Sequence, residues 1–130
     1  MSATLNLLLP AHPEHVATAR RAIGSLCDDL GIQGSIADDI RLAVSEACTA
    51  CVQHSHAATD PTFGIGANLE GDTLLVDVRD FAGGLVRGPL GGGNRGLGIQ
   101  LVRHLAEWTD VSSGSTGGLR VAMRFATHER

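Results

Sequence analysis

The stretch 35–56, SIADDIRLAVSEACTACVQHSH, constrains the fold most, because its spacing predicts one long helix with two different faces. Apolar and small side chains recur in steps of three and four along one face, which predicts that this face is buried. We expect Ser35 to cap the helix N-terminus and Asp38, three residues later, to complete a capping box. The second face carries Glu46, Thr49, Ala50 and Gln53.

Glu46 is unusual because it is a single acid late in a run of small and apolar residues. Such an acid is either a solvated surface residue or a carboxylate held over a pocket. The helix alone favours the surface interpretation, so the rest of the chain has to decide between the two.

Length and charge narrow the class of protein. With 130 residues, the chain is long enough for one hydrophobic core, and we expect a single domain over 1–130. A net charge of -4 and a pI near 5.8 give no sign of a nucleic-acid or membrane surface. No apolar run is long enough to cross a bilayer, and no signal peptide is present. We therefore expect a cytoplasmic protein.

The three cysteines, Cys27, Cys48 and Cys51, do not form a disulfide framework, because their number is odd and two share one predicted helix. Cys48 and Cys51 spell C-x-x-C, but no second pair exists to complete a metal site. We expect buried thiols in a reducing cytosol.

The order of predicted elements indicates the fold class. Apolar periodicity and turn residues predict two strands joined by a turn at 70–72 and a last hairpin near the C-terminus. The order β-α-α-β-β-loop-α-β-β predicts a two-layer α+β sandwich, with a mixed, mostly antiparallel sheet and three helices on one face. The predicted elements are strands 4–9, 63–69, 73–79, 110–113 and 119–125, and helices 13–30, 35–56 and 94–108.

Glycines cluster at 83–98 and 114–118, and the first cluster runs directly into the third predicted helix. Free backbone N–H groups at a helix start suit a phosphate, and Arg95 adds positive charge there. Asp80, at the end of a strand, could accept a hydrogen bond from an exocyclic amine such as that of adenine. A glycine cluster at a helix start is also compatible with a simple turn.

Three motifs now resemble a known family. RLAVSEACTACVQH, VRDFAGGL and GLGIQLV resemble, in order and spacing, the N-box, G1 box and G2 box of the GHKL ATPases, which have the Bergerat-type ATP-binding fold. Within that superfamily the chain is most similar to the anti-sigma-factor serine/threonine protein kinases, in which one ATPase domain is the whole protein. The resemblance covers nearly the full chain.

The resemblance implies a role for each matching residue. Glu46 would be the general base that activates a serine hydroxyl on a partner protein. Asp80 would read the adenine amino group, and Gly84 would let the base lie close to the backbone. The phosphate-binding turn would contain Gly96, Leu97, Gly98 and Ile99.

The resemblance also implies an ATP lid over 85–94, which we expect to be mobile without nucleotide. Arg95 falls where lid residues meet the terminal phosphates, and Arg87 is a weaker candidate for the same role. Phosphoryl transfer needs positioning and charge neutralisation more than covalent help from the protein.

Ala50 is the main departure from the family pattern, which has an asparagine here that holds Mg²⁺ against the phosphates. Alanine has no oxygen to offer, so Mg²⁺ would lose a protein ligand and enter with ATP. Either the protein is a natural degenerate member or the sequence carries a substitution. Thr49 points about 100° away around the helix and is a poor substitute.

Smaller departures lie at the other family positions. Ala82 replaces a usual glycine of the G1 box, and Leu119 and Arg120 stand where the family tends to have a threonine near the adenine, with Thr116 too early to compensate. For His54 and His56, at the helix end, we favour capping or packing over metal binding.

The leading hypothesis is therefore an ATP-binding anti-sigma factor that sequesters a sigma factor and phosphorylates a serine on an anti-anti-sigma antagonist. The alternative is a non-catalytic module that keeps the fold and the partner surface but has lost Mg²⁺-dependent transfer. A histidine-kinase ATPase domain fits less well, because the chain starts in a predicted strand instead of a helical hairpin. The family also implies a homodimer formed through the sheet.

Overall fold

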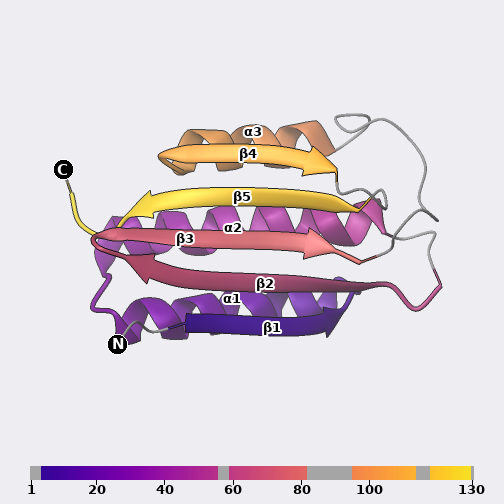
Figure 1. Cartoon of the computed structure of the whole chain (residues 1–130), viewed down its shortest axis with the longest axis horizontal. Helices are drawn as coiled ribbons and strands as arrows, with labels where there is room; N and C mark the ends of the chain where they lie inside the picture. The colour runs from indigo at the N-terminus through magenta and orange to yellow at the C-terminus, as the bar shows by residue number, and fades with distance from the viewer. Residues whose placement is uncertain (1–3, 56–58, 82–94, 114–117, 130) are drawn as a thin grey trace.

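The computed structural model describes residues 4–55, 59–81, 95–113 and 118–129. Within these ranges the chain forms three helices and five strands (Figure 1). In chain order these are β1 (Thr4–Pro10), α1 (Glu14–Asp29), α2 (Gly34–His54), β2 (Thr62–Glu70), β3 (Thr73–Asp80), α3 (Arg95–Leu105), β4 (Trp108–Ser113) and β5 (Leu119–Ala126).

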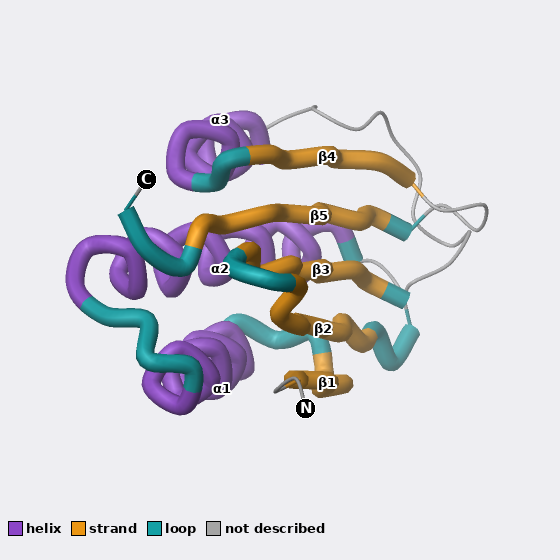
Figure 2. Tube along the Cα trace, turned by 60° about the vertical axis from the view of Figure 1, so that its left-hand side comes forward, coloured by secondary structure: helices purple, strands orange, loops and turns teal. Residues whose placement is uncertain are grey.

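The strands form one sheet in the order β1-β2-β3-β5-β4, and each of the four pairings is antiparallel. The three helices cover one face of this sheet, and the other face is left open (Figures 1 and 2). The predicted α+β sandwich is thus confirmed. Of the helices in the described ranges, none has both the length and the apolar content needed to cross a membrane.

Alternation along the strands decides which side chains enter the core. In β2, Phe63 and Ile65 are buried against the helices, and in β3 the same is true of Leu74, Val76 and Val78. Burying a side chain of this size stabilises the fold by about 1.5–3 kcal/mol. Because β3 lies at the centre of the sheet, its last residue is carried into the buried layer beneath α2.

α2 is the central helix of the covered face, with α1 and α3 packed beside it and β2, β3 and β5 beneath it. Its buried residues include Ile40, Val44, Ala47 and Cys51, each of which is 0% exposed. The Arg20 Nε–H donates to the Ser45 hydroxyl at 2.7 Å, which joins α1 to α2. The position of α2 is therefore fixed from several sides.

The structure corrects the predicted start of α2. The helix begins at Gly34, and Gln33 is the N-cap residue without a side-chain cap hydrogen bond. Gly34 has φ of +65°, so the chain turns one residue earlier than predicted and Ser35 lies inside the helix. Asp38 does not close a capping box; it accepts a hydrogen bond from Arg41 Nη2 at 2.8 Å.

The predicted end of the third helix is also wrong. α3 ends at Leu105, and Trp108 is the first residue of β4. The Glu107 N–H donates to the Arg124 carbonyl at 2.8 Å, and Trp108 pairs with Arg124 across the sheet. The Arg124 guanidinium carbon lies 4.4 Å from the centre of the indole ring. Pairing with a distant strand therefore overrides the local helical pattern.

Candidate functional site

Three residues lie along one face of α2 at steps of four: Glu46, Ala50 and His54. Residues four apart are neighbours on a helix surface, so they form a continuous row. At a rise of about 1.5 Å per residue, Glu46 and His54 are separated by about 12 Å along the helix axis. We call this set the α2 row. Each of its two ends meets a different part of the chain.

At the Glu46 end, the α2 row meets the first turns of α3. A Cβ atom added to Gly98 would lie 3.0 Å from Glu46 Oε1 and 3.9 Å from the Glu46 carbonyl oxygen. The glycine therefore lets the α3 backbone approach the carboxylate closely, which a side chain would obstruct. The structure thus brings Glu46 together with one of the residues predicted for the phosphate turn.

The other residues predicted for that turn also belong to α3, since Arg95, Gly96, Leu97 and Ile99 all fall within Arg95–Leu105. Ile99 is 9% exposed and belongs to the hydrophobic core. Its side chain therefore anchors the helix start against the core. A role at a phosphate would come from its backbone.

At the His54 end, the α2 row meets Asp80, the last residue of β3. Asp80 is 4% exposed, and its Oδ2 atom is 2.7 Å from His54 Nδ1. The same Oδ2 accepts a hydrogen bond from the Leu119 N–H at 3.1 Å. The Asp80 carboxylate is therefore buried and held from both α2 and β5.

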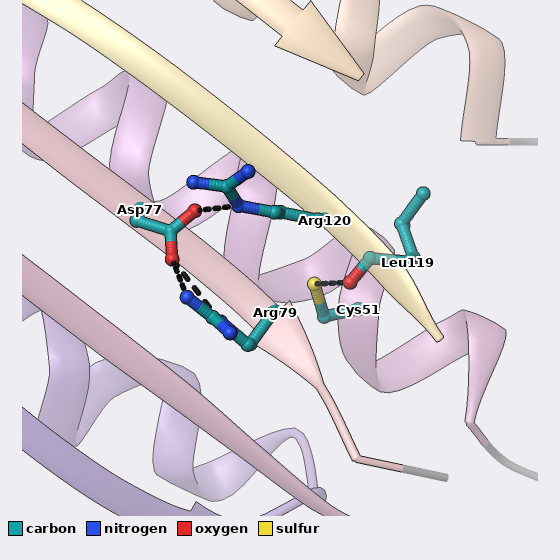
Figure 3. A network of polar contacts seen from close by, with 5 residues as sticks. All are labelled: Cys51, Asp77, Arg79, Leu119 and Arg120. Carbon is teal, nitrogen blue, oxygen red and sulfur yellow. Dashed lines mark hydrogen bonds and ion pairs between the residues drawn. The ribbon is translucent and has the colours of Figure 1, made fainter. Parts of the chain in front are cut away.

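The start of β5 is fitted closely to this carboxylate. A Cβ atom on Gly118 would lie 2.7 Å from the Asp80 carbonyl oxygen and 3.1 Å from Oδ1, which is too close for any side chain. From the other direction, the Leu119 carbonyl accepts a weak hydrogen bond from Cys51 Sγ at 3.9 Å, as Figure 3 shows. The backbone at Leu119 is thus held between α2 and β3.

Ala50, in the middle of the α2 row, is 3% exposed and has no oxygen that could bind a metal. The adjacent Thr49 hydroxyl donates to the Ser45 carbonyl at 2.9 Å, so it is directed back along its own helix. Within the described ranges, no group of three or more His, Cys, Asp or Glu side chains could hold a metal ion. The residue at position 50 therefore does not fit the role of a direct Mg²⁺ ligand.

The cysteines are free and buried, as the sequence predicts. Burial raises the pKa of the Cys48 thiol to about 12. Burial also raises the pKa of Cys27, although the nearby Arg41 partly opposes this effect. A neutral buried thiol is a poor nucleophile, so these residues serve packing.

Several predicted residues lie outside the described residues: His56, Ala82, Gly84, Arg87, the lid 85–94 and Thr116. Hollows of about 760 and 290 Å³ lie on the open face of the sheet and have neither Glu46 nor Asp80 in their walls. The glycine-rich segment 82–94, which follows Asp80 in the sequence, also lies outside the described residues.

The sequence did not predict the contact that His54 makes. We favour capping or packing for this residue from the sequence, whereas the structure pairs it with Asp80. One signal was available, because His54 follows Glu46 and Ala50 at the same four-residue step. The contact itself joins residues 26 positions apart and depends on how α2 lies over β3.

Comparison with known proteins gives consistent results. The sequence pattern of the histidine kinase-like ATPase domain matches residues 9–125. The chain is 29% identical over 151 residues to the serine-protein kinase RsbW of Bacillus pumilus, covering 100% of this chain and 92% of that protein. It is 31% identical over 142 residues to the serine-protein kinase RsbW of Bacillus licheniformis, covering 93% of this chain and 84% of that protein.

Two solved structures have a similar fold. The RsbU and RsbW domains of a Mycobacterium tuberculosis protein match with a TM-score of 0.75 at 23% identity, over 95% of this chain and 32% of that chain. The histidine kinase domain of the Erythrobacter litoralis EL346 blue-light activated histidine kinase matches with a TM-score of 0.50 at 23% identity, over 88% and 60%. At these identities the similarity concerns the fold alone.

Proposed function

The chain belongs to the histidine kinase-like ATPase family, and from this premise we propose that it is an ATP-binding anti-sigma factor of the serine-protein kinase type. In this proposal it sequesters a sigma factor and phosphorylates a serine on an anti-anti-sigma antagonist, in the bacterial cytoplasm. The names of its full-length relatives, serine-protein kinase RsbW, support this choice among the activities of the family.

One observation carries the proposal: the α2 row joins a carboxylate beside a helix start to a second, buried carboxylate. The first pair is Glu46 and Gly98, at the start of α3, where the first N–H groups have no partner within a helix and, with the helix dipole, suit phosphates. The second is Asp80 with His54, where a buried acceptor suits an adenine amino group. The separation of about 12 Å along α2 is of the size that a base and a triphosphate span.

In this arrangement Glu46 takes the proton from the attacking serine hydroxyl of the antagonist as the γ-phosphoryl group is transferred. A general base acts only within hydrogen-bond reach of that proton, so the antagonist serine has to enter beside Gly98. Bound ATP would bring its Mg²⁺, whose remaining ligands at this site would be waters and phosphate oxygens. Because Ala50 supplies no ligand, we expect slow transfer.

The test is a calorimetric titration with ATP and with ADP, each with and without Mg²⁺. We expect both nucleotides to bind, because neither Asp80 at the His54 end of the α2 row nor the predicted phosphate-binding turn 96–99 includes the residue at position 50. Absence of binding under all four conditions would contradict the proposal. The Glu46→Gln variant should reduce phosphotransfer by at least about 100-fold and leave ATP affinity within about threefold. Equal loss of both would make Glu46 a structural residue.

The partners are tested by affinity capture with the tagged chain from the native host, in ATP and separately in ADP. The proposal expects a sigma factor in one nucleotide state and a small antagonist with a phosphorylatable serine in the other. Capture of neither class would contradict it. Transfer of radiolabelled γ-phosphate to the captured antagonist then separates a kinase from the alternative, a regulatory module that binds nucleotide without transfer. Ala50 supports this alternative, because it is buried at the expected Mg²⁺ position and offers no ligand atom.

We also propose that the chain forms a homodimer through the open face of the sheet. This face exposes Leu8 (65%), Phe81 (53%) and Trp108 (43%), three large apolar residues around its hollows. Such an accumulation on one face is typical of an interaction surface. Sedimentation of the wild type and of Leu8→Glu should show a dimer that the substitution weakens, whereas a monomeric wild type would contradict the proposal.

A further inference from the structure

His54 and Asp80 form a buried pair of polar side chains. The His54 side chain is 7% exposed and the Asp80 side chain 0% exposed, and Nδ1 and Oδ2 are 2.7 Å apart. In this pair the Nδ1–H donates to the carboxylate oxygen, since a carboxylate offers only acceptors. A hydrogen bond with a charged partner in a place sheltered from water is stronger and more directional than an exposed one.

The carboxylate is fixed by two donors that come from different elements. His54 ends α2, and the Leu119 N–H begins β5, and both donate to Oδ2. Two bonds to one oxygen, from donors on two different elements, hold this end of the carboxylate in position. A carboxylate has about four acceptor positions, and the two bonds to Oδ2 use two of them.

The end of α2, which carries His54, is closed by hydrogen bonds of its own cap. Ser55, the C-cap residue, is 0% exposed, and its N–H approaches the Cys51 and Gln53 carbonyls. Its hydroxyl donates to the Val52 carbonyl at 3.2 Å. The last turn of α2 is therefore closed by its own cap. His54 is left to make a contact outside its own helix, and it makes that contact with Asp80.

From this geometry we infer that His54 is a positioning residue for base recognition: it aims the Asp80 carboxylate and so sets how strongly the site prefers a purine with a 6-amino group. The inference rests on the proposed function, because it concerns the nucleotide site. His54 does not touch the base in this account. It acts through Asp80, and its removal should weaken discrimination between bases more than it weakens binding of the triphosphate.

A merely structural role would look different. If His54 only neutralised a buried acid, its loss would lower the stability of the fold and the affinity for all nucleotides alike. The two roles are separated by a nucleotide pair that differs only in the group Asp80 reads. ATP and purine riboside triphosphate form such a pair, because the second has a hydrogen in place of the 6-amino group.

The experiment measures the affinities of both nucleotides for the wild type and three variants, His54→Leu, His54→Asn and His54→Gln, after thermal unfolding has shown that each is folded. Asparagine places an amide N–H close to the position of Nδ1, whereas glutamine reaches toward the position of Nε2. We expect the preference for ATP to fall by about tenfold in His54→Leu, equivalent to one hydrogen bond of about 1.4 kcal/mol. Affinity for purine riboside triphosphate should change by less than about threefold. His54→Asn should keep most of the preference and His54→Gln should lose it.

The outcomes are distinct. If the wild type binds ATP and His54→Leu keeps the full preference, or if glutamine restores it as well as asparagine, the inference is overturned and the proposed function stands. If His54→Leu does not fold, the comparison of asparagine with glutamine decides by the same criterion. If the wild type binds neither nucleotide, the proposed function fails and the inference fails with it.

Discussion

The two ends of the α2 row differ in how completely they are built. At the His54 end, a buried carboxylate is held by an imidazole and a backbone N–H, and β5 is fitted against it at Gly118. At the Glu46 end, a glycine brings α3 close to a partly buried acid, but the next position along the row is Ala50 and offers no metal ligand. Under the proposed function, this difference would make recognition of the adenine separable from chemistry at the phosphates.

The largest effect is expected from Asp80→Asn. This change replaces one carboxylate oxygen by an NH₂ donor, so the single remaining oxygen cannot serve both the two N–H donors and the adenine amino group, and we expect ATP affinity to fall by at least about 100-fold. The matched control is Asp77→Asn. Asp77 lies on the same strand, but on the open face between Arg79 and Arg120, at 2.6 Å from each (Figure 3). If calorimetry showed equal losses of ATP affinity in the two variants, the contrast between the two ends of the α2 row would fail.

A smaller effect is expected from Gly118→Ala. The new Cβ would meet the Asp80 carbonyl oxygen at 2.7 Å, so the start of β5 has to move away from the carboxylate. We expect a loss of about 1–3 kcal/mol in the free energy of unfolding and about tenfold in ATP affinity. Gly66→Ala, where the nearest atom is the Leu5 carbonyl oxygen at 3.9 Å, is the control. If the two variants have the same free energy of unfolding and the same ATP affinity, the start of β5 is not closely fitted to Asp80.

Gly98→Ala should act on transfer and spare binding. Its Cβ would lie 3.0 Å from Glu46 Oε1, and this flexible carboxylate can retreat by a few tenths of an ångström. In an Ala50→Asn background we expect the rate of phosphotransfer to fall by about tenfold, while ATP affinity changes by less than about threefold. Displacing Glu46 as the general base lowers the rate of transfer more than it lowers binding. A fall in affinity as large as the fall in rate would contradict this prediction, because it would show that the added Cβ disturbs the phosphate-binding turn and not Glu46 alone.

The smallest effect concerns the thiols behind the row. Cys48 and Cys51 are both 0% exposed, and Cys51 contacts the Leu119 carbonyl at the base end. At about pH 8 we expect a thiol reagent to label neither residue until the protein unfolds. Labelling of Cys51 well before Cys48 would show that the His54 end of the α2 row opens. This result would weaken the contrast between the two ends of the row.

The raised pKa of Cys48 also gives a sign for the pH dependence of stability. The unfolded thiol ionises near pH 9 and the buried one near about 12. The stability that comes from burying the neutral Cys48 thiol is therefore present in full below about pH 9. It is lost as the pH rises toward about 12. Denaturant titrations across this range should show falling stability, with a smaller fall in Cys48→Ala.

Much of the fold could be predicted from the sequence, because strand alternation and helix periodicity are local patterns. The errors lie where distant or backbone effects decide. Gly34 turns the chain through a positive φ and displaces Ser35 from the cap, and cross-strand pairing with Arg124 draws Trp108 into β4.

For the candidate site, the resemblance identified Glu46, Asp80 and the glycine turn, and the structure brings Glu46 against Gly98. The partner of Asp80 could not be predicted, because a helix pattern indicates only that His54 lies near the helix end. Its contact with the end of β3 depends on the packing of α2 over the sheet.

The central claim is that base recognition is intact while the Mg²⁺ ligand at position 50 is missing. Its most direct test is the ATP affinity of the wild type and of Ala50→Asn, each with Mg²⁺ and with a chelator. We predict that Mg²⁺ changes ATP affinity by less than about threefold in the wild type and by about tenfold or more in Ala50→Asn. An equal response to Mg²⁺ in the two proteins, or no binding by either, would contradict the account.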